Sequence, residues 1–497
     1  MRRAVILLLL IGAIRIAATY TIFSETADEP MHLSAGLELL SKHQYTIHPV
    51  NPPLPRLLIA LPPWLAGASF HGGGDYIADE VMVMYYSTGH YKTMLVLSRI
   101  GTLVFFLIGA LATWAWARRE IDDTTALVAL LFFTTQPSIL GHSGLATVDA
   151  AGTAGLAVAM LAFSRWLERP DFRRASVLGA AWGFAISCKL LCIVYVPLAC
   201  AAIAIVRLLS DPETRARWRS VITIIAVPPA AAFVVWAGYG FSMSSAIPAP
   251  ELIRGIQQML EVNRGGFSSY AMRQWSNEGW WWYFPLTVAL KTTLATLLFA
   301  AAGFVVARKN RTFLEAMAGA GAILGFSMPT HVNIGIRYIL PIYVFLSVAA
   351  AIAALAMLRD RQKFVRVAAM VLVSWHLIAS AAAHPDYLAY FNELAGRDPS
   401  RYLIDSNLDW GQDILRLRDE VRRMKIDQLG VALFGPANLE KLAFPPHSYV
   451  DSETPTHGWI AVSDHTYRWA QPYGGWKWLD REHCRRIGKS IRLCQVE

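Results

Sequence analysis

The sequence predicts an α-helical protein that crosses a membrane many times, followed by a small soluble α/β domain. Of the 497 residues, 55% are hydrophobic and only 16% are charged, whereas soluble domains carry about 25% charged residues. Apolar runs of about twenty residues, long enough to cross the hydrocarbon core, recur along the chain. After residue 383 these runs stop, and short strand and helix patterns replace them.

About eleven apolar runs are expected to span the membrane. The stretch 174–208 could form one long helix or two shorter ones. The first run has a basic start and could be a signal peptide, but Arg15 interrupts it and no clean cleavage site follows it, so an uncleaved anchor is favoured. The expected spans are 4–23, 95–117, 124–140, 150–167, 174–190, 191–208, 219–241, 284–306, 312–328, 338–357 and 364–383.

The placement of positive charge orients these spans. The short segments expected inside are rich in arginine and lysine, as at Arg118 and Arg119, and this places the N-terminus in the cytoplasm. The large segments 24–94 and 242–283 then lie outside. The net charge of +9 is therefore mostly a topology signal, and no nucleic-acid partner is expected. The expected domains are 1–383 in the membrane and 384–497 on the outer side.

The C-terminal part has a coarse β-α-β pattern. RYLID (401–405) reads as a strand, WGQDILRLRDEVRRMK (410–425) as a helix, and QLGVALFG (428–435) as a second strand. A last strand is expected in SIRLCQV (490–496). Cys484 and Cys494 flank RRIGKSIRL (485–493), a short turn entering this strand, so they form a disulfide if this domain faces an oxidising space, and otherwise remain unpaired thiols.

Two adjacent acids, Asp28 and Glu29, lie where the first span re-enters water on the outer side. Pro30 suits the first turn of a helix expected from Met31 to Ser41, so Asp28 can serve simply as a helix cap. Ionisable groups at a membrane boundary more often mark functional sites. Asp149, at the outer mouth of the third and fourth spans, has the same two interpretations.

Several stretches, spread in order over nearly the whole length, resemble the GT-C superfamily of lipid-carrier-dependent glycosyltransferases. The resemblance is to its bacterial branch, near the protein O-mannosyltransferases and aminoarabinose transferases. The matching stretches are TADEPMHLSAG (26–36), GHSGLATVDAAG (141–152), GFAISCKL (183–190), EGWWWYFPLTVALKTTL (278–294), VNIGIRYILP (332–341), YLAYFNELAG (387–396), YLIDSNLDWGQDILRL (402–417) and the segment around PYGGWKWL.

The resemblance implies a GT-C fold and an inverting transfer of one sugar from a polyprenyl-phosphate donor to an acceptor hydroxyl of a protein, a lipid or a glycan. Attack by that hydroxyl needs a base, and a carboxylate can supply it. Asp28 matches the acid of the family's first outer loop and is the expected general base. Glu29 is expected to orient the acceptor or a metal, and Asp149 is a further catalytic candidate.

The leaving group is a lipid phosphate, so the site is expected to contain cations. Lys189 ends an apolar helix on the outer side, and Arg337 lies where the tenth span begins. Both are isolated cations at predicted outer boundaries, and the resemblance makes them candidate ligands of the carrier phosphate. The alternative is that their side chains reach toward lipid headgroups.

Further residues are candidates for the substrate pocket. The histidines lie near the acid pair, where a divalent metal could also bind, although no recognised ligand spacing is present and no cofactor is firmly expected. The aromatic residues of segment 242–283 either shape the pocket or form an interfacial belt. The acids Asp405, Asp409 and Asp413 are expected only to shape a helix start. The pocket candidates are His32, His48, Tyr270, Trp280 and Lys291.

The predicted protein is thus a multi-pass glycosyltransferase of the bacterial inner membrane, with its active site and C-terminal domain in the periplasm. Two other classes remain open. A lipid-linked-sugar transporter or flippase would also place charges near the bilayer, but repeated halves are expected for it and none is found. A glycan-binding membrane protein without catalysis would make the C-terminal domain a docking module.

Overall fold

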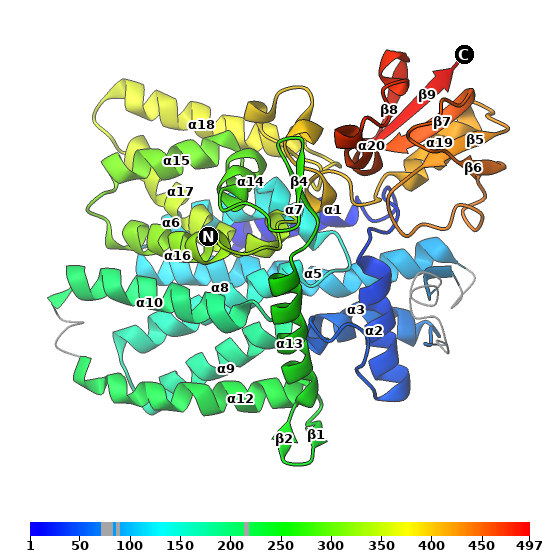
Figure 1. The fold of residues 1–497 in the computed structure, drawn as a ribbon. Helices are drawn as coiled ribbons and strands as arrows, with labels where there is room; N and C mark the ends of the chain where they lie inside the picture. The colour runs from blue at the N-terminus through cyan, green and yellow to red at the C-terminus, as the bar shows by residue number, and fades with distance from the viewer. Residues whose placement is uncertain (71–82, 86–89, 213–217) are drawn as a thin grey trace.

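The computed structural model describes residues 1–70, 83–85, 90–212 and 218–497. Most of its helices lie side by side, while the main sheet sits apart from them near the C-terminus (Figure 1). Parts of the predicted outer segment 24–94, at 71–82 and 86–89, lie outside the described residues. The described α-helices are α1 (Arg2–Ala17), α2 (Glu29–Lys42), α3 (Pro53–Leu65), α5 (Tyr91–Glu120), α6 (Asp123–Thr135), α7 (Pro137–Ser143), α8 (Asp149–Glu168), α9 (Phe172–Cys188), α10 (Cys192–Ser210), α12 (Val227–Gly238), α13 (Pro250–Gly265), α14 (Tyr283–Lys291), α15 (Leu294–Val306), α16 (Arg311–Ser327), α17 (Ile342–Leu358), α18 (Lys363–Ala382), α19 (Ile414–Arg423) and α20 (Asp464–Ala470).

The predicted class, a helical multi-pass membrane protein, is confirmed. Every predicted span contains helix, and 174–208 forms two helices, α9 and α10, separated at Lys189. Among the described residues five helices are long and apolar enough to cross a membrane, or up to seven if two bent pairs each form one span. The chain bends by 61° between α6 and α7 and by 111° between α14 and α15. The two breaks are in contact, because Ser138 Oγ at the start of α7 donates to the carbonyl of Lys291 at the end of α14, at 2.9 Å. That contact satisfies a carbonyl freed by the break.

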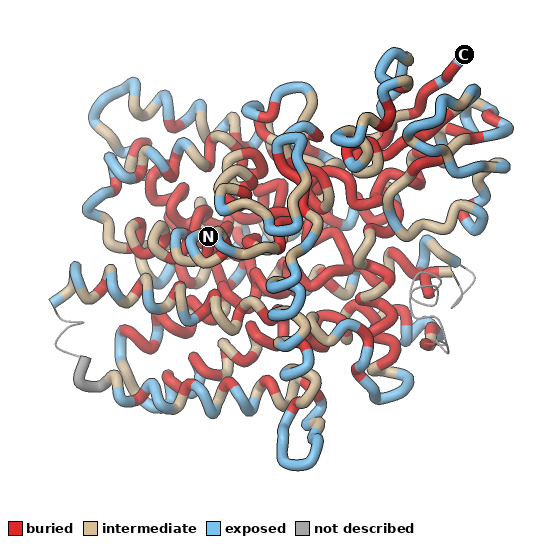
Figure 2. Tube along the Cα trace, in the orientation of Figure 1, coloured by how far each residue is buried: buried red, intermediate tan, exposed pale blue. Residues whose placement is uncertain are grey.

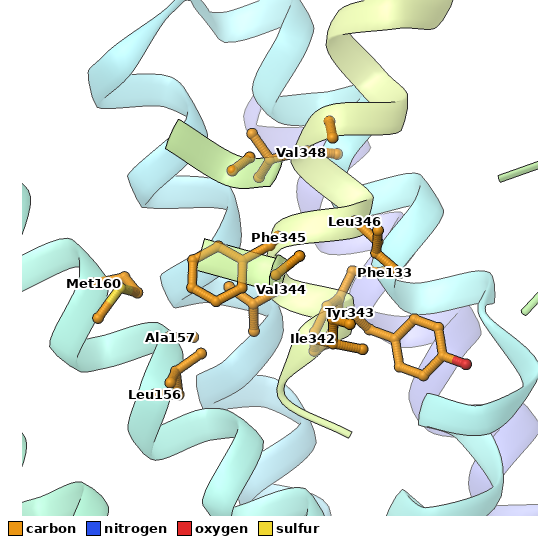
Figure 3. Close-up of a cluster of buried hydrophobic side chains, with 14 of the residues drawn as sticks. Phe133, Leu156, Ala157, Met160, Ile342, Tyr343, Val344, Phe345, Leu346 and Val348 are labelled. Carbon is orange, nitrogen blue, oxygen red and sulfur yellow. The ribbon is translucent and has the colours of Figure 1, made fainter. Parts of the chain in front are cut away.

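Helix α17 forms the centre of the membrane part. It is apolar on all sides, and nearly all of its side chains are buried, as expected for a helix that other helices surround. Figure 3 shows Phe345 and its neighbours on α17 beside Phe133 of α6 and Met160 of α8. Buried residues run through the middle of the helix layers in Figure 2, and exposed ones gather at loops and outward faces. The largest apolar cluster of the described membrane part therefore surrounds α17, and separate clusters lie beside α2 and α3 and between α5 and α8.

The C-terminal part contains a five-stranded sheet in the order β6-β5-β7-β9-β8. β5 pairs in parallel with β6 and β7, whereas β9 runs antiparallel to β7 and β8. The predicted α19 packs Leu417 and Val421 under this sheet, and Cys484 forms a disulfide with Cys494. The strands are β5 (Leu429–Ala432), β6 (His447–Tyr449), β7 (Gly458–Ser463), β8 (Cys484–Ile487) and β9 (Ile491–Val496); two small hairpins, β1–β2 (Met243–Ser244, Ile247–Pro248) and β3–β4 (Ser269–Ala271, Gln274–Ser276), lie between α12 and α14.

Two expectations for this region were wrong. RYLID is not a strand, because it enters a short 3-10 turn, η5 (Asp405–Asn407), that binds the membrane part. The side chains of the acids after it do not shape the helix start, since Asp413 is the N-cap residue of α19 but makes no side-chain capping hydrogen bond. Asp409 accepts a hydrogen bond from the His465 amide at 2.7 Å, and Asp413 accepts one from the Lys489 amide at 2.9 Å. These carboxylates instead join segment 405–414 to the C-terminal domain.

Candidate active site

Four of the charged residues predicted for the site lie together, although they come from four distant segments. The Asp28 carboxylate accepts a hydrogen bond from the Arg337 guanidinium. Lys189 Nζ donates to Asp149 Oδ1 at 2.6 Å and to the Arg337 carbonyl at 2.9 Å. Arg337 thus connects the two acid–base pairs, one through its side chain and one through its backbone. We call these four residues the charged constellation.

Each member of the charged constellation lies at the end of a helix or in a tight turn. Asp28 precedes α2, and Asp149 is the first residue of α8; carboxylates at helix N-termini are stabilised by the helix dipole. Lys189 follows α9 in an extended conformation. Arg337 lies in a 3-10 turn, η2 (Ile336–Ile339), before α17. These ends therefore converge on one side of the helix layers.

The two acids of the constellation differ in access. The Asp28 side chain is 27% exposed, whereas that of Asp149 is 3% exposed. Asp149 Oδ2 also accepts a hydrogen bond from Thr147 Oγ1 at 3.1 Å, and His142 Nδ1 lies 4.0 Å from the same oxygen. The carboxylate of Asp28 is thus partly open to its surroundings, whereas that of Asp149 is enclosed by the protein groups around it.

Glu29 lies in a different environment from its neighbour Asp28. It is fully buried and forms a two-bond ion pair with Arg99, each bond 2.8 Å long. It also accepts hydrogen bonds from the amides of Thr26 and Ala146, both at 2.8 Å. Because its oxygens are filled by the protein, Glu29 is not placed to orient an acceptor or a metal. It positions the chain around Asp28, which corrects the catalytic role expected for it.

Lys291 lies outside the charged constellation. Its Nζ donates to the carbonyls of Leu388 at 2.8 Å and Asn407 at 2.6 Å, and the Phe391 ring lies 4.3 Å away. The side chain is buried and connects α14 to two distant loops. Lys291 is therefore a structural cross-link in this structure, not a wall of an open pocket.

The predicted histidine candidates do not assemble a metal site. His32 is buried, and its Nδ1 accepts a hydrogen bond from Arg56 Nε at 3.1 Å. Burial, and then the charge of Arg56, hold the pKa of His32 well below its ordinary value; the charges of Asp149 and Arg337 also act on it. His48 is exposed. Among the described residues, no three His, Cys, Asp or Glu side chains gather as metal ligands.

The two aromatic pocket candidates lie on the segment before α14. Tyr270 is buried in the β3–β4 hairpin, with its ring 5.1 Å from that of Trp275. Trp275 in turn packs on Trp469 of the C-terminal part at 4.4 Å. The Trp280 amide donates to Asn333 Oδ1 at 2.7 Å, four residues before Arg337. Tyr270 thus joins domains, whereas Trp280 borders the segment that carries Arg337.

The sequence did not identify Trp410 as a site residue. Its indole lies against the Arg337 guanidinium, 4.4 Å from ring centre to carbon, a distance typical of a cation–π contact. The stretch YLIDSNLDWGQDILRL, which contributes to the GT-C resemblance, was the available signal. No pattern in it shows which distant residue its tryptophan contacts.

Comparison with known proteins gives a family match for part of the chain. Residues 94–237 match the sequence model of the dolichyl-phosphate-mannose-protein mannosyltransferase family. This match covers less than a third of the chain and includes Asp149 and Lys189. No curated protein sequence matches the chain significantly.

A solved structure shows a similar fold over almost the whole chain. The apo structure of ArnT from Cupriavidus metallidurans is 14% identical, with coverage of 99% of this chain and 97% of ArnT and a TM-score of 0.50. The chain has a GT-C fold. The resemblance expected from the sequence is confirmed at this level. ArnT bound to undecaprenyl phosphate gives 13% identity, 98% and 97% coverage and a TM-score of 0.49. The archaeal oligosaccharyltransferase AglB from Archaeoglobus fulgidus gives 14% identity, 91% and 62% coverage and a TM-score of 0.47.

The contrast between the two adjacent acids of this GT-C chain is testable. Glu29→Gln leaves the buried Arg99 charge without its partner, so it should lower the free energy of unfolding by about 3–5 kcal/mol. Asp28→Asn is the matched control and should have a smaller effect, because Asp28 is partly exposed. Thermal denaturation of the purified variants in detergent measures both. Equal losses in the two variants would contradict this assignment.

Proposed function

We propose that the chain is a GT-C glycosyltransferase that moves one sugar, with inversion, from a polyprenyl-phosphate donor to an acceptor hydroxyl of a protein, a lipid or a glycan. The charged constellation is the observation that carries the proposal. In it, the partly exposed carboxylate of Asp28 pairs with Arg337, and Arg337 is bonded to Lys189, the other expected phosphate ligand. The family name, dolichyl-phosphate-mannose-protein mannosyltransferase, supports a lipid-phosphate donor.

The proposed chemistry assigns a role to each member of the constellation. Arg337 and Lys189 bind the donor phosphate, since guanidinium and ammonium groups form strong charge-assisted hydrogen bonds to phosphate oxygens. Asp28 takes the proton of the acceptor hydroxyl as its oxygen bonds to the anomeric carbon. The bond from that carbon to the phosphate oxygen breaks, and the phosphate leaves with the electron pair. Asp149 keeps Lys189 oriented.

Arg337 also gives the site an order of events. Without donor, its guanidinium is bonded to Asp28. When a donor phosphate binds Arg337, the phosphate competes with Asp28 for the same N–H groups. Asp28 is then released to accept a hydrogen bond from the acceptor. In this proposal the base becomes available only once the donor is present, which protects the donor site from an acceptor that binds alone.

The proposal predicts that Asp28→Asn separates binding from transfer. The variant should lose transfer by about 10²–10⁴-fold because the base is gone. It should bind donor at least as tightly as the wild type, since Arg337 no longer has Asp28 as a competing partner. The measurements are sugar transfer and donor binding in lipid nanodiscs, with a panel of polyprenyl-phosphate sugars.

The matched control for this experiment is Asp386→Asn. It breaks another partly exposed ion pair, Asp386 with Arg416 at 2.6 Å, and should leave transfer and binding unchanged. Transfer that survives in Asp28→Asn would remove Asp28 from the chemistry. Failure of the wild type to bind any polyprenyl-phosphate sugar would contradict the donor class.

We also propose that the constellation and the C-terminal domain face the periplasm of a bacterial inner membrane. The arginine-rich segments expected on the cytoplasmic side support this orientation. Tyr449→Cys, on an 88% exposed residue of the sheet, should react with a membrane-impermeant maleimide in cells whose outer membrane alone is permeabilised. Arg308→Cys, on the predicted inner side, should react only after lysis. The reverse pattern would contradict the orientation.

A further inference from the structure

Segment 405–410, for which the sequence suggested no catalytic role, forms part of the wall around Arg337. Ser406 Oγ donates to the Ile334 carbonyl, and the Ile336 amide donates to Asn407 Oδ1 at 3.1 Å. Gly335 has φ +140°, and a Cβ at this position would overlap Ser406 Oγ. The side chains of one segment thus bond the backbone of the other, and Asp405 lies near enough to Arg337 for their charges to interact.

The same segment also holds the chain that carries Asp28. The Ala27 amide donates to the Trp410 carbonyl at 3.0 Å, and the Trp410 indole lies on the Arg337 guanidinium. Trp410 therefore contacts the phosphate-binding cation through its ring and the residue before the proposed base through its backbone. Asp405, Asp28 and Arg337 are consequently held in one local environment.

Asp405 has a left-handed backbone and a partly exposed carboxyl group. Its φ of +55° lies in the left-handed region, which Asp adopts more often than most residues. Its Oδ1 accepts a hydrogen bond from the adjacent Ser406 amide, and the Ser406 side chain also acts on this carboxyl group. Because Asp405 is only partly buried, its carboxyl group can meet a ligand.

Arg337 provides an independent indication of a ligand at this place. Its Nε is buried, and no acceptor among the described residues takes its hydrogen. Buried donors are normally satisfied, and an unmet one indicates a missing partner. A phosphate oxygen is a suitable partner for a guanidinium N–H. The unmet donor belongs to Arg337, whose charge acts on Asp405, so both residues lie at the same proposed phosphate site.

Charge balance distinguishes Asp405 from the other two acids. Arg337 and Lys189 already pair with Asp28 and Asp149, which leaves Asp405 as a third carboxyl without a cation of its own. Burial raises the pKa of Asp405 to about 6; Arg337 opposes this rise and Asp28 adds to it. The titratable groups that act on it or respond to it are Arg337 and Tyr338 of η2, Asp28 before α2 and Tyr283 of α14.

We propose that Asp405 is a donor-binding residue that carries a proton when the donor is bound and donates it as a hydrogen bond to an oxygen of the donor phosphate. This inference rests on the proposed function. An ionised Asp405 would repel the phosphate, whereas the neutral acid offers it a donor. Donor binding therefore takes up a proton, and the pKa of Asp405 rises further in the complex.

The coupling between donor binding and protonation of Asp405 fixes the direction in which donor affinity changes with pH. Because the donor binds the protonated form, affinity is full at pH values below the pKa of Asp405 in the free protein. Above that pKa, affinity falls by up to about tenfold for each pH unit, until the complex itself loses the proton. The donor phosphate is a diester with one charge across this range, so its own titration does not contribute.

The test uses the wild-type protein in lipid nanodiscs and an unreactive probe, polyprenyl methyl phosphate, which has the same single charge as the donor. The dissociation constant should change little below about pH 5 and rise up to about tenfold between about pH 7 and pH 8. Asp405→Asn keeps an N–H donor but does not titrate, so its affinity should be independent of pH and exceed that of the wild type at about pH 8. Asp398→Asn, which removes an acid paired with Arg468 at 2.7 Å, should keep the wild-type pH dependence.

A second measurement needs no variant. Calorimetry of the wild type in buffers of different ionisation enthalpy counts protons taken up with the probe, and about one per site is expected near pH 7. A count near zero, or a wild-type affinity that does not vary with pH, would overturn the role of Asp405 while leaving the proposed function intact. The same holds if Asp405→Asn retains the wild-type slope. If the probe does not bind at any pH, the proposed donor class fails and the inference fails with it.

Discussion

The buried ion pair between Glu29 and Arg99 determines how the site is assembled. Arg99 also donates to the carbonyls of Tyr20, Phe23 and Ser24, and Glu29 accepts from the amide of Ala146. One pair therefore binds the end of the first helix, the loop that carries Asp28 and the loop that leads to Asp149. Two charges in an apolar interior are tolerated only when both are fully bonded. This requirement allows few arrangements of these three segments and keeps the two site acids near each other.

Segment 405–414 has a comparable function on the other side of the site. It binds the Arg337 segment through Ser406 and Asn407, the Asp28 loop through Trp410, and the C-terminal sheet domain through Asp409 and Asp413. Burial raises the pKa of Asp409 to about 7, with a further contribution from Asp464. The sheet domain is thus connected to the site by a short, buried and polar segment, so its position bears directly on the geometry of Arg337.

The sequence predicted the fold more fully than the site. Apolar runs and charge placement depend on local composition, and every predicted span contains helix. The stretch 174–208, left open as one helix or two, forms α9 and α10, whereas α3 and α13 were not among the predicted spans. Within the site, Asp28 was predicted from the acid pair at a membrane boundary and from its match to the family's first-loop acid. Arg337 was predicted as an isolated cation at an outer boundary, which the resemblance made a phosphate ligand. Glu29 was misassigned because adjacent acids look alike in sequence, although successive residues at the start of a helix point in different directions. RYLID was expected to be a strand because its residue types suit one, but its contacts with the Arg337 segment decide its conformation.

The sequence by itself determined the helical membrane architecture, the small C-terminal α/β domain and the presence of acids and cations suited to a lipid-phosphate substrate. Only the tertiary structure decided that Asp28 pairs with Arg337, that Glu29 is buried against Arg99, and that segment 405–410 packs on the Arg337 segment. The physical reason is the range of the interactions. Periodicity and helix capping are set by neighbours a few residues apart, whereas the Asp28–Arg337 pair joins positions 309 residues apart. Such contacts form only when packing of the intervening helices brings the segments together.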